Sequence, residues 1–260
     1  MSTTMKGAEV AKAMKETLIR EAEALKEKGI LPCLTIIRVG ARPDDLAYER
    51  GAKKRMELIG IECRVRELPE DISQREFEKE FQKINQDPSV HGILLFHPLP
   101  DHLDEKPVKS IIHPYKDVDC MSNVNIAKVF AGDETGFAPC TAEAVVRMLD
   151  HYGIDPKGRK VTVVGRSMVV GKPLAMLLLD RHGTVTLCHT RTADLEEECR
   201  KAQILVAAAG KAGMITEAMT GQDAVVVDVG INVDENGRLC GDVDFDAVEP
   251  RASYISPVPG

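Results

Sequence analysis

The chain has 260 residues, of which 43% are hydrophobic and 20 are glycine, a composition typical of a folded globular protein with one or two domains. Its 34 lysines and arginines against 41 aspartates and glutamates give a net charge of −7, which argues against broad nucleic-acid binding. No stretch approaches the roughly 18 apolar residues of a membrane span, and the charged first 30 residues exclude a signal-peptide core. We therefore expect a cytoplasmic protein with neither a membrane nor a nucleic acid as partner.

The seven cysteines agree with this compartment. The closest pair, Cys188 and Cys199, lies eleven residues apart, so CxxC spacing is absent and no metal site is expected. Several cysteines sit in apolar runs, where the residue behaves as a small hydrophobe. The sequence predicts reduced, structural thiols.

The first half of the chain alternates between helical and strand patterns. Apolar residues three to four apart predict a helix over 8–27, ending at Gly29. Further along, the patterns predict a strand at Leu34–Val39, a helix at 44–59, a strand at Ile61–Leu68, a helix opened by the capping box of Ser73 and Glu76, and a strand at His91–Leu95.

A second alternating series follows residue 140. It comprises a helix at Thr141–Tyr152 and strands at Lys160–Val164, Val185–Leu187, Ile204–Ala208 and Ala224–Val229. Alternating strands and helices imply parallel sheets covered on both faces. We therefore predict two α/β domains, 1–139 and 140–260, the second a Rossmann-like parallel sheet, with the active site in the cleft between them.

The segment from Gly165 to Pro173 carries the clearest chemical signal. An apolar strand runs into Gly165, and a short loop with Arg166 and Ser167 leads to Gly171 and a helix. Glycine permits close backbone approach, and a helix N-terminus offers N–H groups and partial positive charge to a phosphate. The glycines are six apart, unlike GxGxxG, so an ordinary tight strand-to-helix turn is the alternative. The pattern favours a dinucleotide site.

The next predicted strand bears on which dinucleotide is bound. NAD sites place an acidic residue about 20 residues on, at the ribose 2′-hydroxyl. Here Thr190 and Arg191 follow the strand, and no carboxylate occurs before Asp194. A hydroxyl and a guanidinium suit a 2′-phosphate, so we predict NADP. Arg191 as a solvated surface charge is the alternative. The turn at Ile231, after another buried strand, is placed to meet the nicotinamide half.

Several segments together resemble one family, the bifunctional methylenetetrahydrofolate dehydrogenase/methenyltetrahydrofolate cyclohydrolases. They span nearly the whole chain in the right order: ArgProAspAspLeuAlaTyr (42–48), GlyIleLeuLeuPheHisProLeuPro (92–100), LysAspValAsp (116–119), ProCysThr (139–141), GlyArgSerMetValValGlyLysPro (165–173), AspValGlyIleAsn (228–232) and ProValProGly (257–260).

The resemblance implies a homodimer that oxidises 5,10-methylenetetrahydrofolate to 5,10-methenyltetrahydrofolate with NADP and opens the product to 10-formyltetrahydrofolate. This is one-carbon metabolism, which feeds purine biosynthesis. It assigns Tyr48 and Asp119 to the pterin and the reacting carbon. It assigns the segments of Pro98, Leu99 and Pro257 to the substrate. On the cofactor it implies Gly165, Arg166, Ser167, Thr190 and Ile231, to which the patterns above add Gly171 and Arg191. Without the resemblance, Tyr48 as a packing residue and Asp119 as a turn residue are the alternatives.

Two positions depart from the family pattern. The family has a lysine four residues after its tyrosine, where this chain has Ala52, and a glutamine where this chain has Phe96. Lys53 and Lys54 follow, but on a helix they lie about 140° and 240° around from Tyr48. His97 is a polar neighbour that strand alternation would turn to the other face. Hydride transfer needs mainly proximity and orientation. We therefore expect dehydrogenase activity to persist, and cyclohydrolase activity to be weak, absent or rebuilt on Lys53, Lys54 or His97. Of these, Lys54 joins Tyr48 and Asp119 as a catalytic candidate.

Two other functions stay open on the sequence. One is another two-domain NADP dehydrogenase, of the shikimate type; the other is a non-catalytic folate or nucleotide sensor, suggested by Ala52 and Phe96. The family continues beyond ProValProGly, whereas this sequence stops at Gly260, which favours trimming of the chain.

Overall fold

The computed structural model describes residues 2–259, which form two compact units. One comprises the N-terminal residues through Ala11 and the chain from Pro139 onward; the other is Lys12–Ala138. The predicted division, 1–139 and 140–260, differs from these units at the N-terminus. There β1 (Thr3–Thr4) pairs in parallel with β11 (Ala252–Ile255), with Thr3 opposite Tyr254. A two-residue strand has no periodicity in the sequence, so only the pairing reveals it.

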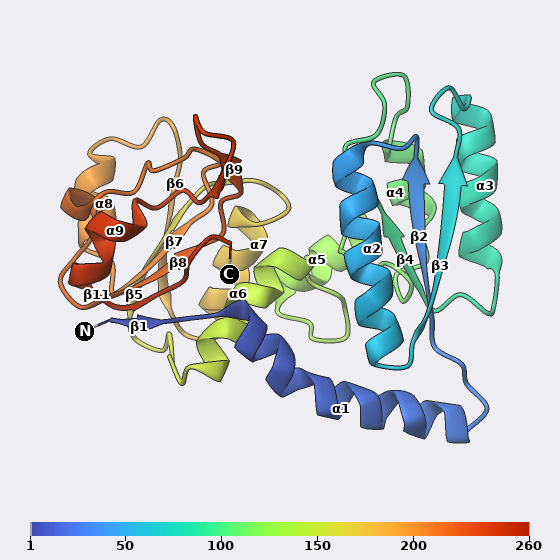
Figure 1. The fold of residues 1–260 in the computed structure, drawn as a ribbon, viewed down its shortest axis with the longest axis horizontal. Helices are drawn as coiled ribbons and strands as arrows, with labels where there is room; N and C mark the ends of the chain where they lie inside the picture. The colour runs from blue at the N-terminus through green and yellow to red at the C-terminus, as the bar shows by residue number, and fades with distance from the viewer. Residues whose placement is uncertain (1, 260) are drawn as a thin grey trace. The chain divides into compact units, whose positions relative to one another are not determined.

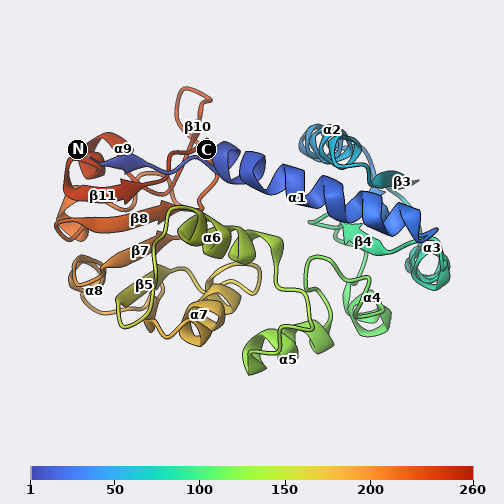
Figure 2. The same ribbon diagram turned by 90° about the horizontal axis from the view of Figure 1, so that it is seen from below.

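The unit that contains the C-terminal half is built on a six-stranded parallel sheet, ordered β1-β11-β8-β7-β5-β6 (Figures 1 and 2). Its other elements, in chain order, are α6 (Cys140–His151), β5 (Lys160–Val164), α7 (Gly171–Asp180), β6 (Thr184–Cys188), α8 (Leu195–Arg200), β7 (Ile204–Ala207), η1 (Glu217–Met219), β8 (Ala224–Asp228), β9 (Asn232–Val233), β10 (Leu239–Cys240), α9 (Phe245–Val248) and η2 (Glu249–Arg251). The four predicted strands and the helix after residue 140 are all present.

Successive residues of these strands pack into different cores, one on each face of the sheet. Val163 lies in one hydrophobic cluster and Val164 in the other, and Ile204 and Leu205 divide in the same way. Both faces are covered, as the unbroken apolar runs predict. Because the chain passes from β5 to β6 on one side and then to β7 on the other, the strand order reverses between β5 and β7. Ligands of such sheets bind outside the carboxyl ends of the strands at this switch point.

The other unit has a three-stranded parallel sheet, ordered β3-β2-β4 (Figure 1). Its strands are β2 (Cys33–Val39), β3 (Glu62–Leu68) and β4 (Gly92–Leu95), with helices α1 (Gly7–Glu27, shared with the first unit), α2 (Pro43–Leu58), α3 (Gln74–Gln86), α4 (Lys106–Ile111) and α5 (Asn123–Ala131). Ile37, Phe77 and Phe81 are fully buried in its core. Ser73 caps α3 as predicted, since its hydroxyl accepts a hydrogen bond from the Glu76 N–H at 3.3 Å.

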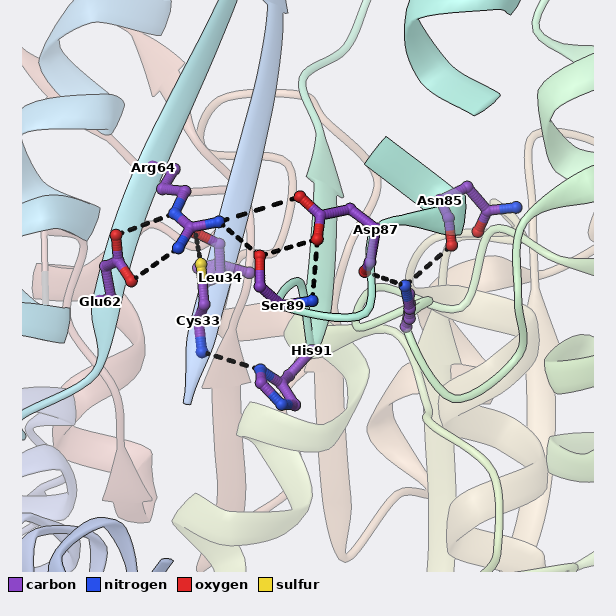
Figure 3. A network of polar contacts seen from close by, with 9 residues as sticks. Cys33, Leu34, Glu62, Arg64, Asn85, Asp87, Ser89 and His91 are labelled. Atoms are coloured by element: carbon purple, nitrogen blue, oxygen red, sulfur yellow. Dashed lines mark hydrogen bonds and ion pairs between the residues drawn. The ribbon is translucent and has the colours of Figure 1, made fainter. Parts of the chain in front are cut away.

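A polar network joins the starts of the three strands of this unit (Figure 3). Arg64 binds Glu62 at 2.8 Å and the Ser89 hydroxyl at 2.8 Å, and the Cys33 N–H donates to Nδ1 of His91 at 3.3 Å. Burial raises the pKa of the Cys33 thiol. The network therefore ties together the amino ends of the three strands.

Within residues 2–259 no helix is long and apolar enough to cross a membrane. The same residues contain no group of three or more histidine, cysteine, aspartate or glutamate side chains placed to hold a metal ion.

Candidate functional site

The turn after β5 is closed so tightly that only glycine fits at two positions. Gly165 has φ +136°, and a Cβ there would lie 2.1 Å from the carbonyl oxygen of Ala208. A Cβ on Gly171 would lie 2.0 Å from the carbonyl oxygen of Gly165. Real Cβ atoms do not approach oxygen this closely, so both glycines are required by the shape of the turn. Their cradle is the kind of surface that lets a backbone approach a pyrophosphate.

Ser167 shapes the loop between these glycines. Its hydroxyl accepts a hydrogen bond from the Val170 N–H at 3.0 Å, with the Gly171 N–H 3.5 Å away, at the first turn of α7. The side chain of Arg166 beside it is exposed. The loop thus presents a helix N-terminus together with an exposed guanidinium, which is a combination suited to phosphate groups.

The turn after β6 lies on the same edge of the sheet, because Val164 and Cys188 are paired at the ends of β5 and β6. Thr192 and His189 hold this turn: the Thr192 hydroxyl accepts from the His189 N–H at 2.8 Å, and Nδ1 of His189 accepts from the Arg191 N–H at 3.0 Å. The side chains of Thr190 and Arg191 are left exposed. They are available to a phosphate on an adenosine ribose.

A buried carboxylate, which the sequence reasoning did not single out, organises the loop after β7. Asp242 is fully buried and accepts hydrogen bonds from three successive backbone N–H groups, those of Ala209, Gly210 and Lys211, at 2.5, 2.9 and 2.8 Å. It also accepts from Nδ2 of Asn232 at 2.9 Å. One side chain therefore fixes the loops that follow both β7 and β8.

Asp228, at the end of β8, has a matching role. Its carboxylate accepts from the N–H groups of Gly230, Asp242 and Val243 at 3.0, 3.0 and 2.9 Å. Burial raises its pKa, while these hydrogen bonds oppose the shift. A Cβ on Gly230 would lie 2.3 Å from the Asp242 carboxyl carbon. The cage holds Ile231 outward, 78% exposed. The signal available in the sequence was two aspartates in glycine-flanked loops after strands.

In the other unit, a cavity of about 540 Å³ opens at the carboxyl end of β4 and the start of α2. It brings together Tyr48, Pro98 and Asp119 of the expected site residues. The complete lining is Arg42, Asp44, Asp45, Tyr48, Leu94, Leu95, Phe96, His97, Pro98 and Asp119. An aromatic ring, apolar walls and a carboxylate suit a flat heterocycle that carries N–H donors.

Two contacts fix the walls of this cavity. The ring of Tyr48, 63% exposed, meets Phe96 edge to face with centroids 5.3 Å apart. Arg42 binds both carboxylate oxygens of Asp45, at 2.9 and 2.8 Å, and donates to the His97 carbonyl at 3.1 Å. The start of α2 is thereby tied to the segment after β4.

His97 departs from the expectation based on strand alternation, which was wrong. β4 ends at Leu95, so the alternation does not extend to Phe96 and His97, and both line the cavity. Nδ1 of His97 lies 3.3 Å from Oε2 of Glu105.

Three other expected residues lie outside this cavity wall. Lys54 is exposed on α2 and is not among the described residues that line the cavity. Leu99 is partly buried against the core of its unit, beside the cluster that contains Phe77. Pro257 belongs to the other unit, where it follows β11 and is half-buried.

The parallel six-stranded sheet, with its glycine-lined turn at the switch point, defines an NAD(P)-binding domain, and the chain is a two-domain α/β enzyme of the dehydrogenase class. Two family models match it: "Tetrahydrofolate dehydrogenase/cyclohydrolase, catalytic domain" over residues 5–119, and "Tetrahydrofolate dehydrogenase/cyclohydrolase, NAD(P)-binding domain" over residues 139–260. The chain belongs to the tetrahydrofolate dehydrogenase/cyclohydrolase family, as the sequence predicted, and this decides against the shikimate-type alternative.

Similar proteins agree. The "Bifunctional protein FolD" of Clostridioides difficile is 55% identical over 98% of this chain and 89% of its own length, and that of Clostridium kluyveri is 53% identical over 100% and 92%. The crystal structure of the bifunctional enzyme from Campylobacter jejuni superposes with a TM-score of 0.97 at 39% identity, covering 100% of this chain and 92% of that one. The Trypanosoma brucei enzyme, complexed with NADP cofactor and inhibitor, gives 0.93 at 36%, covering 100% and 91%.

Proposed function

We propose that the protein oxidises 5,10-methylenetetrahydrofolate to 5,10-methenyltetrahydrofolate with NADP as hydride acceptor, and that it hydrolyses the product only slowly. The observation that carries the proposal is the cavity that unites Tyr48 and Asp119 in one unit, in a chain whose other unit keeps the complete dinucleotide turn. Membership of the family supplies the substrate class.

The residues of the cavity have direct tasks in the oxidation. The Tyr48 ring offers a face to the pterin, and the Asp119 carboxylate accepts N–H hydrogen bonds from it. Oxidation removes a hydride, with its electron pair, from the methylene carbon and leaves an amidinium cation across N5 and N10. No proton has to move in this step, so orientation of the two reactants is the main requirement.

The dinucleotide turn fits NADP by shape and by charge. The cradle of Gly165 and Gly171 accepts a pyrophosphate, and Arg166, Thr190 and Arg191 are exposed at the strand ends where a 2′-phosphate would lie. NADP, when bound, supplies the nicotinamide carbon that receives the hydride. We expect the loop of Ile231, which is held by Asp228 and Asp242, to contact that ring.

Hydrolysis of the methenyl product has different needs. Water must lose a proton as it attacks, and the family uses its lysine and glutamine for this step. Here Ala52 carries no polar group, and Phe96 packs its ring against Tyr48. None of the described residues that line the cavity is a lysine or a glutamine. Loss of general acid–base catalysis typically costs about 10²- to 10⁴-fold, so we expect hydrolysis to be slow.

The test follows absorbance after mixing the protein with methylenetetrahydrofolate and NADP, then with NAD, and finally with methenyltetrahydrofolate alone. We expect NADP reduction with accumulation of the methenyl product. Arg191→Ala should raise the KM for NADP about 10-fold or more, through loss of a charge-assisted bond, and leave the KM for NAD unchanged. Binding of both ligands without reduction would instead identify a non-catalytic sensor. Rapid hydrolysis by the wild type would refute the second half of the proposal.

Two further properties belong to the proposal. The family resemblance supports a homodimer, which sedimentation equilibrium would test. Seven cysteines without closely spaced pairs support a reducing, cytoplasmic environment; localisation of a tagged chain would test this.

A further inference from the structure

We propose that His97, oriented by Glu105, is the proton acceptor for water in the residual hydrolysis of methenyltetrahydrofolate. This inference rests on the proposed function, because it assigns a catalytic residue to the second reaction of the same cavity. The assignment concerns the part of the hydrolysis rate that exceeds the uncatalysed rate, however small that part is.

The position of the imidazole is the first observation. His97 is the one histidine among the described residues that line the cavity, which it shares with Tyr48 and Asp119. Arg42 binds its carbonyl oxygen at 3.1 Å and is itself anchored to Asp45, so the backbone at His97 is fixed to the cavity wall. A base that shares a cavity with the pterin-binding residues meets the first geometric requirement for acid–base catalysis.

The orientation of the ring is the second observation. Nδ1 lies 3.3 Å from Oε2 of Glu105, the residue that precedes α4, and Oε1 of Glu105 binds Nζ of Lys109 one helical turn further on. A carboxylate this close to Nδ1 stabilises the tautomer that carries its proton on Nδ1, which leaves Nε2 as the basic nitrogen. Glu105 and His97 therefore form a carboxylate–imidazole pair in which Nε2 can take up a proton.

The surroundings of the ring favour the uncharged, basic form of the His97 imidazole at neutral pH. The groups that act on it are Glu105, which precedes α4, Lys109 from α4 and Asp119 from the segment before α5. Burial lowers the pKa of His97 below its ordinary value, the two carboxylates oppose this shift, and Lys109 adds to it. The imidazole is thus uncharged at neutral pH and becomes protonated, and inactive as a base, as the medium is acidified.

The chemistry balances with this single base. Water adds through oxygen to the amidinium carbon while one of its protons passes to Nε2 of His97, which gives a neutral carbinolamine. In the collapse, the C–N5 bond breaks, its electron pair and the proton from His97 go to N5, and the hydroxyl proton leaves to solvent as C=O forms. The sum is methenyltetrahydrofolate plus water giving 10-formyltetrahydrofolate plus one proton.

Other candidate bases are less suitable. Lys53 and Lys54 are exposed and are not among the described lining residues. The carboxylate of Asp45 is bound at both oxygens by Arg42. Asp44 also lines the cavity, but its side chain is exposed. The matched control is Asp101, an exposed aspartate in the segment after His97 that is not among the described lining residues.

The experiment compares wild type, His97→Gln, Glu105→Gln and the control Asp101→Asn. Hydrolysis of methenyltetrahydrofolate is measured across pH, with the uncatalysed rate in the same buffer subtracted, alongside the dehydrogenase rate and the unfolding temperature. We expect the wild-type catalysed rate to fall on acidification below about pH 6.5. His97→Gln should lower the ratio of hydrolysis to dehydrogenation at least tenfold and abolish the pH dependence. Glu105→Gln should move the midpoint of the wild-type pH profile to lower pH, since Glu105 favours the protonated imidazole.

Three results would overturn the assignment: a wild type no faster than buffer, a His97→Gln variant with the wild-type ratio and pH profile, or a loss of the same size in Asp101→Asn. None of these three results bears on the dehydrogenase activity, so the dehydrogenase part of the proposed function would stand. Absence of NADP reduction by the wild type would instead reject the proposed function itself. Because Glu105→Gln keeps the imidazole, its pH midpoint provides a second reading if His97→Gln does not fold.

Discussion

The turn after β5 and the cavity after β4 both lie at the carboxyl ends of parallel strands, but they are built from different parts of the chain. The turn is a backbone structure, in which Gly165 and Gly171 give the shape through close approaches to main-chain atoms. The cavity is a side-chain structure assembled from α2, the end of β4 and the residue Asp119. The first depends on close approach of the backbone, and the second on which side chains happen to meet.

This difference explains how one activity can weaken while the fold persists. A side chain can be exchanged without moving the backbone, as Ala52 and Phe96 illustrate in a chain whose elements remain those of the family. A side chain added in the turn would displace the backbone, because the atoms nearest to its glycines are main-chain atoms. Substitutions in the two regions should therefore differ in kind as well as in size.

The largest effect is expected for Gly171→Ala. A Cβ would lie 2.0 Å from the Gly165 carbonyl oxygen, so the turn must open and the phosphate cradle is lost. Overpacking of this kind costs about 3 kcal/mol, and NADP affinity should fall roughly 100-fold. Isothermal titration calorimetry measures the affinity for NADP.

Gly51→Ala is the matched control, because that glycine lies inside α2 and a Cβ there would have nothing within 4 Å. This change should raise the free energy of unfolding by about 0.5–1 kcal/mol. Unaltered NADP binding by Gly171→Ala would show that the turn is not the phosphate site.

Asp242→Asn should follow in size. An amide in place of this buried carboxylate turns an N–H₂ group toward backbone donors, which leaves buried groups unpaired at a cost of about 1–3 kcal/mol. We expect a 10- to 100-fold fall in NADP-dependent turnover, with an unfolding temperature lowered at the same time. Asp246→Asn removes an exposed carboxylate of the same loop region and should change neither quantity. Equal effects of the two variants would mean that charge, not the hydrogen-bonded cage, is what matters.

Asp119→Asn tests the cavity, and it should affect the folate substrate but not NADP. The carboxylate is expected to accept N–H bonds from the pterin, and loss of such charged bonds costs about 1.5–3 kcal/mol. The kcat/KM for methylenetetrahydrofolate should fall by at least about tenfold, while the dissociation constant for NADP stays the same. Asp101→Asn, an exposed aspartate of the same unit, is the control. A parallel loss of NADP affinity would break the separation between the two regions.

Restoring the family pair should add an activity. In Ala52→Lys combined with Phe96→Gln, the lysine stands about 40° around α2 from Tyr48, and the glutamine replaces the ring that packs against it. We expect methenyltetrahydrofolate hydrolysis to rise at least about tenfold, with each single variant giving less. Stopped-flow absorbance measures the rate. No gain in the double variant, with dehydrogenase activity retained, would show that these two positions do not limit hydrolysis as we propose.

The sequence predicts features that are set by neighbouring residues, and it does not predict features that depend on segments far apart in the chain. Strand and helix patterns located the main elements, and the capping box of Ser73 was correct, because these are local properties. His97 was named as a candidate but assigned to the wrong face, because β4 ends at Leu95 and the alternation does not reach it. The pairing of β1 with β11 was missed, since it depends on segments that meet only in the fold. The cage of Asp228 and Asp242 was missed for the same reason: its fourteen-residue separation carries no periodic signal.

The smallest effect belongs to a feature that is wholly local, the cap of α3. Ser73→Ala removes the hydroxyl that accepts from the Glu76 N–H, and should lower the free energy of unfolding by about 1 kcal/mol without changing NADP affinity. Hydrogen bonds from the Ser73 hydroxyl and N–H lower the pKa of the Glu76 carboxyl below its ordinary value. Because this pKa is lower in the folded chain than in the unfolded chain, the ionised carboxyl stabilises the fold at pH values above the unfolded pKa. The stabilisation is lost as the pH falls through the folded pKa. The difference between wild type and variant in urea denaturation should therefore be largest near neutral pH and shrink on acidification. Ser110→Ala, which removes only a bond within α4, should show no such pH dependence. A gap that stays constant with pH would mean that Glu76 contributes nothing to the cap.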